Sequence, residues 1–448
     1  MKKTVTILIF ILVGFKTFSQ LQPTGDKRFN FSIADCINYA YEHQNTVVNA
    51  NLDIKSAEYR IRETIGTGLP QISGQATFTD YLKLPTTLLP GEFLGQPGTF
   101  IPVKFGVNYN SNLALNASQL IFSGSYFIGL KAAKTFRELS NRNYTRSKID
   151  VNVEVTKAYY QVLVSNEQIR LLDANINQLK QQVDQTTAQN KQGFVEKIDV
   201  DRITVQYNNL VTNRENILRL LALNYQLLKF QMGMPIEYNL TLADKLADTG
   251  LDNNVISYTT DTTFYRNRVE YGLLETQKNL YGLDVRNRIS QYYPSLTANG
   301  SAASAFQNNT FGQLYNSSFP SSYVGLTLNV PIFNGFQRYY QVKQAKITYI
   351  KSQNDLINLK NSLNLEASQA SVSYTNGLQT LNNQKKSQEL AREVLRVSKI
   401  KYQQGVGSSI EVTQAQTELE NADNQYIQGL YDALVSKVDL DRAYGRIK

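Results

Sequence analysis

The chain has 448 residues, of which 42% are hydrophobic and 19% are charged, and its formal net charge is +9. With one cysteine and one histidine, it cannot form an intrachain disulfide or a metal site built from several cysteines or histidines. The excess cations are dispersed, which favours a solvated helix surface over a nucleic-acid-binding face. The sequence has no glycine-rich phosphate loop and no nucleophile elbow. We therefore expect no enzymatic activity, no cofactor, no bound metal and no nucleic-acid partner.

The N-terminus has the three parts of a secretory signal peptide. Lys2 and Lys3 precede an apolar run from Val5 to Phe15, and small residues follow up to Ser19. A membrane anchor is the alternative interpretation, but the apolar run is too short to span a bilayer. We expect residues 1–19 to be removed and the mature chain to be exported.

A polar, extended lead-in is predicted for residues 20–31, and a first helix from Ile33 to about Ile65, capped by Ser32. The sequence period then changes to two. From Gln71 to Leu82, and again from Val107 to Ile121, one face is largely apolar and the other is polar. This alternation is typical of outer-membrane strands, which contact lipid on one side and water on the other. Residues 83–106 contain four prolines and are predicted to form a long external loop.

Very long helices are predicted after each pair of strands. No proline interrupts residues 124–193 or 335–405, and at about 1.5 Å per residue each helix would be roughly 100 Å long. Shorter helices are predicted to return over residues 199–232 and 411–444. Spacings of three and four residues indicate a coiled-coil seam on the first long helix, at Ile169, Leu172, Ile176, Leu179 and Val183.

The chain is an internal duplication. Gly193 and Gly405 lie 212 residues apart, and so do Asp199 and Glu411. A constant offset predicts one structural unit used twice. Strands are predicted again from Leu296 to Phe306 and from Val324 to Ile332. We divide the chain into a signal peptide at 1–19, a first repeat at 20–233, a linking equatorial segment at 234–263 and a second repeat at 264–448. The first repeat contains a β-hairpin at 71–122 and a tip at 193–199. The second repeat contains a β-hairpin at 295–333 and a tip at 405–411.

Four strands cannot close a barrel, and an open sheet edge cannot face lipid. Transmembrane barrels have at least about eight strands, so the chain must form oligomers if its hairpins lie in a membrane. A dimer would supply eight strands and a trimer twelve.

The duplicated order of elements, with Tyr402-x-x-Gly405 leading to Ile410-Glu411-Val412-x-x-Ala415-Gln416, resembles the TolC-type outer-membrane efflux channels. The likeness covers roughly residues 30–446. It implies a mainly α fold with a β-barrel portion. The resemblance further implies a homotrimer, in which the four transmembrane β-strands of each chain close one 12-stranded barrel in outer-membrane lipid. The long helices of the trimer form an α-helical coiled-coil barrel that extends into the periplasm. It also implies a periplasmic adaptor protein (a membrane fusion protein) that links the channel to an inner-membrane pump.

The resemblance also suggests roles for residues at the second tip. The family has an acidic pair around its narrowed pore, and the matching positions are Glu411 and Gln414. One carboxylate ring is therefore kept and the other is lost, which should weaken cation selectivity. For Glu411, an acid that only stabilises a helix N-terminus is an equally good interpretation.

Closed-state contacts in the family match Asp199 and Tyr402. The arginine that completes these contacts in the family is replaced by Gly407, so we expect a closed tip held by weaker contacts or by other residues. Adaptor docking in the family uses the grooves beside both tips, and the matching residues are Gly193, Phe194, Val195, Gly405, Val406, Gly407 and Ser408. Gly193 and Gly405 also have a purely conformational explanation, because glycine suits the residue that ends a helix.

The function that follows is a passive, gated exit duct in the cell outer membrane, part of a tripartite efflux or secretion system. An exported structural or adhesive trimeric coiled coil without channel activity is the alternative. The alternation from Val324 to Ile332 argues against it. A free-standing porin would not need two helices of such length.

Overall fold

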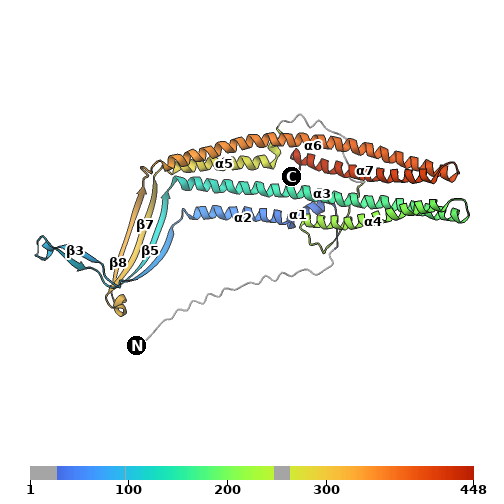
Figure 1. Ribbon diagram of the computed structural model, residues 1–448. Helices are drawn as coiled ribbons and strands as arrows, with labels where there is room; N and C mark the ends of the chain where they lie inside the picture. Colours follow the sequence, from blue (N-terminus) through green and yellow to red (C-terminus); the bar gives the residue numbers. More distant parts are fainter. Residues whose placement is uncertain (1–27, 96, 247–262, 448) are drawn as a thin grey trace.

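The computed structural model describes residues 28–95, 97–246 and 263–447, so the predicted signal peptide lies outside the described residues. The molecule is elongated (Figure 1). A β-sheet lies at one end, and helices run from it to two hairpin tips at the other end. None of the helices in the described ranges is both long and apolar enough to cross a membrane.

One antiparallel sheet joins the strands of both halves of the chain. Its members are β2 (Gln71–Asp80), β5 (Tyr109–Phe122), β7 (Ser295–Asn308) and β8 (Ser318–Asn329), in the order β2-β5-β7-β8. The first hairpin therefore pairs with the second through β5 and β7. Strands β2 and β8 each have a free edge in the part of the chain that the structure describes.

The two faces of this sheet differ in polarity, as predicted. On β8, Val324 is 91% exposed and Leu326 72% exposed, although both are aliphatic. On the opposite face, Asn116 is in register with Ser301 and accepts a 2.8 Å hydrogen bond from its hydroxyl. Asn299 donates to the Thr327 hydroxyl on the same face, at 2.9 Å.

We predicted a long external loop for residues 83–106, but the structure has two further strands there. They form a second hairpin, β3 (Thr86–Pro90) and β4 (Phe100–Lys104), joined through a 3-10 turn, η1 (Gly91–Leu94). Proline in a strand needs an edge where its missing N–H is not required. In a two-stranded ribbon every strand has such an edge, so Pro90 and Pro102 are tolerated. Likewise, η4 (Phe311–Asn316) and the start of β8 lie in the segment between the two strands predicted for the second repeat.

The first predicted helix is two helices, α1 (Ile33–His43) and α2 (Asn45–Gly66). Ser32 and Asp35 form the capping box at its start, which confirms that cap. The break at Gln44 is a tertiary effect. The side-chain amide of Gln44 donates hydrogen bonds to the backbone carbonyls of Phe230 and Gln231, at 3.3 and 3.1 Å. Gly233 approaches so closely that a Cβ there would lie 2.8 Å from the Gln44 Cα.

The two long helices are continuous, as predicted. Helix α3 (Gly124–Lys191) has 68 residues and α6 (Gln337–Gln403) has 67, so each is about 100 Å long. They return as α4 (Lys197–Met232) and α7 (Ser409–Ala443). The predicted seam is confirmed, since Leu172 and Leu179 are buried against Ile203 and Leu210 of α4, with Ile176 and Val183 beside them.

A compact region surrounds the middle of the long helices. Strand β1 (Arg28–Phe31) pairs in parallel with β6 (Asn239–Leu242), although the sequence showed no period there. The Asp244 carboxylate accepts hydrogen bonds from the Ile33 amide and the Tyr159 hydroxyl, at 3.0 and 2.8 Å. Cys36 is fully buried in the adjoining cluster. Burial, with smaller effects from nearby carboxylates, raises its pKa to about 12 and makes the thiol unreactive.

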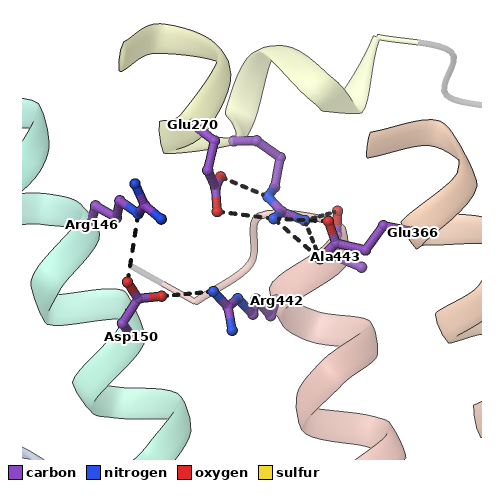
Figure 2. Close-up of polar contacts among 7 residues, drawn as sticks. Arg146, Asp150, Glu270, Glu366, Arg442 and Ala443 are labelled. Atoms are coloured by element: carbon purple, nitrogen blue, oxygen red, sulfur yellow. Dashed lines mark hydrogen bonds and ion pairs between the residues drawn. The ribbon is translucent and has the colours of Figure 1, made fainter. Parts of the chain in front are cut away.

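A network of ion pairs ties four helices together at the same level (Figure 2). The 3-10 turn η3 (Phe264–Asn267) leads into α5 (Val269–Ser290), and Arg268 between them has a side chain only 4% exposed. Its guanidinium pairs with Glu270 at 3.0 Å and with Glu366 of α6 at 3.2 Å. It also donates to the Ala443 carbonyl at the end of α7, at 3.0 Å.

A second pair lies beside the first. Arg442 of α7 donates to Asp150 of α3 at 2.7 Å, and Arg146 lies 3.6 Å from the same carboxylate. The Glu270 carboxylate is also close to Arg442, which contributes to its low pKa. These contacts fix the ends of α5 and α7 against both long helices.

We predict that Arg268→Gln destabilises the protein by about 3 kcal/mol. Removing one partner of a buried ion pair costs roughly 3–5 kcal/mol, and a value near the lower end is expected because the Glu366 side chain is 44% exposed. Thermal unfolding of the detergent-purified variant measures the loss. The control is Arg170→Gln, which removes an exposed pair with Glu167 and should cost less than about 1 kcal/mol.

The same pair predicts a pH dependence. Burial acts to raise the pKa of Glu270, but the hydrogen bonds and charge of Arg268 outweigh it and hold that pKa below its ordinary value of 4.5. The stabilisation is therefore present above pH 4.5 and is lost as the pH falls through the lowered pKa. The stability difference between wild type and Arg268→Gln should narrow in that acid range. An equal difference at neutral pH and at about pH 3 would contradict the ion-pair explanation.

Candidate functional site

The two helical tips are built in the same way. Gly193 and Gly405 have φ values of 81° and 76°, in the left-handed region that favours glycine. The next amide in each tip donates back into the preceding helix, from Phe194 to the Gln189 carbonyl at 3.0 Å and from Val406 to the Lys401 carbonyl at 3.1 Å. This is the geometry that ends a helix with a glycine. A conformational role therefore accounts for both glycines.

The returning helices begin differently. Ser408 caps α7, and its hydroxyl accepts from the Glu411 amide at 3.2 Å. Glu196 occupies the cap position of α4 and makes no side-chain cap hydrogen bond. Asp199, the equivalent of Glu411, instead accepts a hydrogen bond with its carboxylate from the Ser409 hydroxyl of the other tip. Arg202 lies 3.6 Å from the same carboxylate. Asp199 thus connects the two tips within one chain, and its partner Ser409 was not among the residues singled out from the sequence.

Tyr402 lies near this contact without completing it. Its hydroxyl is buried and has no hydrogen-bond partner among the described residues. Burial raises the pKa of Tyr402, and the negative charge of Asp199 adds to this effect. The predicted closed-state residues are therefore brought close together, but a single chain forms no hydrogen bond between them.

Gly407 occupies a crowded position. A Cβ there would lie 3.0 Å from the Lys401 Cβ and 3.1 Å from the Tyr402 backbone nitrogen. Both distances are shorter than those of most real Cβ contacts, and the Tyr402 nitrogen belongs to the backbone, which cannot easily move away. The tip as folded here has little room for a side chain at the position where the resembling family has arginine.

The predicted aperture residues lie on the exposed side of α7. Glu411 and Gln414 are both exposed, whereas Val412 and Ala415 between and beside them are buried. The Glu411 carboxylate forms no ion pair with another of the described residues. A spacing of three residues places Glu411 and Gln414 on one helix face.

The remaining predicted docking residues form the outer surface of the tips. Phe194 is 77% exposed and Val406 is 76% exposed, at matching positions 212 residues apart. Val195 is half-buried, and its carbonyl accepts from the Asn190 side chain at 2.8 Å. Ile198 and Ile410, also 212 residues apart, are 49% and 55% exposed, so each tip exposes two large apolar side chains to solvent. Isolated apolar residues are common on surfaces, but a repeated one at a helical tip is a candidate contact point.

A polar groove adjoins the tips. It encloses about 190 Å³ between α3 and α6. Lys399 and Tyr402 line one wall, and burial lowers the pKa of Lys399 to about 8. The other wall is a row of glutamines whose spacing of four, three and four residues repeats along one face of α3, at Gln178, Gln182, Gln185 and Gln189. This regular spacing of glutamines is visible in the sequence and is the signal from which the groove could have been predicted.

The residues that the structure describes contain no group of three potential His, Cys, Asp or Glu metal ligands. His43 lies far from the tips in sequence and stacks on Tyr39 with ring centroids 3.9 Å apart.

Comparison with known proteins identifies relatives along most of the chain. The family model described as "Outer membrane efflux protein" matches residues 36–223 and 284–446. Outer membrane protein TolC of Escherichia coli (strain K12) is 24% identical over 397 residues, which cover 83% of this chain and 78% of that protein. The proteases secretion protein PrtF of Dickeya chrysanthemi is 22% identical over 354 residues, covering 76% of this chain and 73% of that protein.

Solved structures share the fold. A crystal structure of CusC aligns with a TM-score of 0.75 and 16% identity, covering 96% of each chain. The open state of the Neisseria gonorrhoeae MtrE outer membrane channel gives a TM-score of 0.73 and 16% identity, covering 92% of this chain and 88% of that one. At these identities the similarity shows the architecture alone.

We predict that Asp199→Asn loosens both tips. A hydrogen bond to a charged group contributes about 1.5–3 kcal/mol, so amide hydrogen exchange near Ser409 and Asp199 should accelerate by roughly tenfold or more. Asp201→Asn is the matched control, since it removes the same charge from an exposed position on the same helical turn. If both variants exchange at equal rates, the contact between Asp199 and Ser409 does not hold the tips together.

Proposed function

The chain belongs to the outer membrane efflux protein family, and on that premise we propose that it is the outer-membrane exit duct of a tripartite efflux or secretion system. Three copies would close a 12-stranded barrel from the four-stranded sheet of each. The helices of the two repeats, at residues 20–233 and 264–448, would form the tunnel through the periplasm. Such a channel moves cargo passively and needs no catalytic residue.

The observation that carries this proposal is the sheet. Its apolar face is exposed along β8, and both of its edges lack a partner among the described residues. In lipid, an unpaired strand edge leaves backbone N–H and C=O groups unsatisfied at a cost of several kcal/mol each. Closure by copies of the same chain removes that cost. An adhesive coiled coil would leave the apolar face without a partner, so that alternative is not supported.

We further propose that the tips form the periplasmic gate and the adaptor-docking end. Phe194 and Val406 are the most exposed apolar residues there, and the polar groove beside Tyr402 supplies hydrogen-bonding groups. A periplasmic adaptor protein would contact these surfaces and link the duct to an inner-membrane pump.

Glu411 is proposed to line the narrowed aperture as a ring of three carboxylates. We predict that Glu411→Gln lowers the ratio of cation to anion permeability by roughly twofold or more, because the ring no longer concentrates cations. Reversal potentials in planar bilayers measure the ratio. The matched control is Glu418→Gln, which lies two turns further along the same exposed face and should leave the ratio unchanged. If both variants form channels with the wild-type permeability ratio, the chain is a duct but Glu411 does not line its aperture.

The buried hydroxyl of Tyr402 is proposed to bond in the closed trimer, with a group of a neighbouring subunit. We predict that Tyr402→Phe and Asp199→Ala each increase the conductance or open fraction of purified channels. The loss of a net hydrogen bond of about 0.5–1.5 kcal/mol corresponds to a shift of roughly two- to tenfold in the open fraction. Conductance unchanged in both variants would refute this account of the closed state. Failure of the wild-type protein to insert, where a control porin inserts, would refute the duct itself.

A further inference from the structure

A repeated surface motif lies directly below the sheet, in the first turns of α3 and α6. Each copy has an aromatic residue, a lysine four positions later and a second lysine three positions after that. The copies are Phe127, Lys131 and Lys134 in α3, and Tyr339, Lys343 and Lys346 in α6, with each pair of equivalents 212 residues apart. All six are exposed, whereas Ala133 and Ala345 are buried.

The spacing places the members of each motif on one helix face, because residues four and three apart are neighbours on a helix surface. In the second copy, the Lys343 ammonium lies 5.4 Å from the centroid of the Tyr339 ring. The two repeats therefore present the same combination of a ring and two ammonium groups.

The motif follows the strands of the sheet closely in sequence. Strand β5 ends at Phe122 and α3 begins at Gly124. Ile332 and Phe333, at the matching place in the second half, are 93% and 76% exposed. Lys131 is seven residues beyond Gly124, which is about 10 Å along the helix. The headgroup layer on each side of a membrane is roughly 5–8 Å thick, and a lysine stem adds several ångströms of reach.

The charge of this region is one-sided. Residues 124–137 contain three cations and no carboxylate, and residues 335–351 contain four cations and no carboxylate. None of the four motif lysines forms an ion pair with a residue in the described ranges.

We propose that this face binds the anionic phosphate headgroups of phospholipids in the periplasmic leaflet, an inference that rests on the outer-membrane location proposed above. The aromatic rings lie at the boundary with the acyl chains, where such rings are favoured. The lysines extend to the phosphates. Each lysine near an anionic surface raises the binding constant roughly fivefold, and a trimer carries the motif six times.

A first experiment measures lipid retention. Purified trimers are equilibrated with a mixture of phosphatidylethanolamine and phosphatidylglycerol, washed with detergent, and their retained lipids are quantified by mass spectrometry. The wild type is expected to retain phosphatidylglycerol several-fold above its share of the mixture. The combined variant Lys131→Gln, Lys134→Gln, Lys343→Gln and Lys346→Gln should return to the bulk ratio.

The matched control loses the same four charges from exposed lysines elsewhere, with the changes Lys180→Gln, Lys191→Gln, Lys386→Gln and Lys401→Gln. It should keep the enrichment. An enrichment that survives loss of the motif, or that is lost equally in the control, would overturn the proposal.

A second experiment locates the aromatic residues, and it exploits the absence of tryptophan from the chain. Single tryptophans at Phe127 or Tyr339 should be quenched by lipids brominated near the headgroup, and Phe194→Trp at the tip should not. Leu326→Trp on β8 reports insertion of the barrel. If Leu326→Trp is quenched and the motif variants are not, this face points to the tunnel or to a neighbouring subunit and the lipid proposal fails. If Leu326→Trp is also unquenched, the proposed membrane location itself fails.

Discussion

Unpaired strand edges are the constraint on which the rest of the molecule depends. The sheet ends at β2 on one side and at β8 on the other, and its exposed apolar face suits lipid, where neither edge can remain open. Pairing β8 of one chain with β2 of the next removes both edges at once. Since the two halves of each chain supply equivalent hairpins and helices, closing the sheet also arranges the helices below it into a ring of repeated units.

Movable helical hairpins in such a ring need both fixed and adjustable contacts. The buried pairs around Arg268 fix the middle of the molecule, where removal of one partner is costly. Nearer the tips, the contacts between repeats are amide-rich. Asp423 of α7 is buried and accepts from the Asn175 and Gln388 side chains, at 2.9 and 2.7 Å. Because the acceptor is a carboxylate, each of these hydrogen bonds contributes about 1.5–3 kcal/mol, so the two repeats are also held together in the tip half of the molecule.

The sequence predicted the elements whose signals are local. Uninterrupted helical period located α3 and α6, glycine located both tips, and alternation located the four strands. What it missed depends on contacts distant in sequence. The break at Gln44 follows from the close approach of Gly233. Asp199 accepts a hydrogen bond from Ser409 only because the two tips lie side by side. The β3–β4 hairpin was missed because its prolines normally argue against strands, and a two-stranded ribbon is the exception.

The polar face of the sheet also determines where charge selection must occur. Gln71, Ser118 and Asn299 are in register across it, and none of the strand positions on that face carries a charged side chain. A wall of amides and hydroxyls solvates cations and anions alike, since both groups offer donors and acceptors. A closed barrel lined by this face would therefore discriminate weakly by charge. On the proposed assignment, selection would then fall to the helical end, where Glu411 is exposed without an ion-pair partner among the described residues and Gln414 on the same face is neutral. A duct with one such carboxylate ring and an uncharged barrel would favour cations only at its gate, so the selectivity of the whole channel would depend on how narrow that gate is.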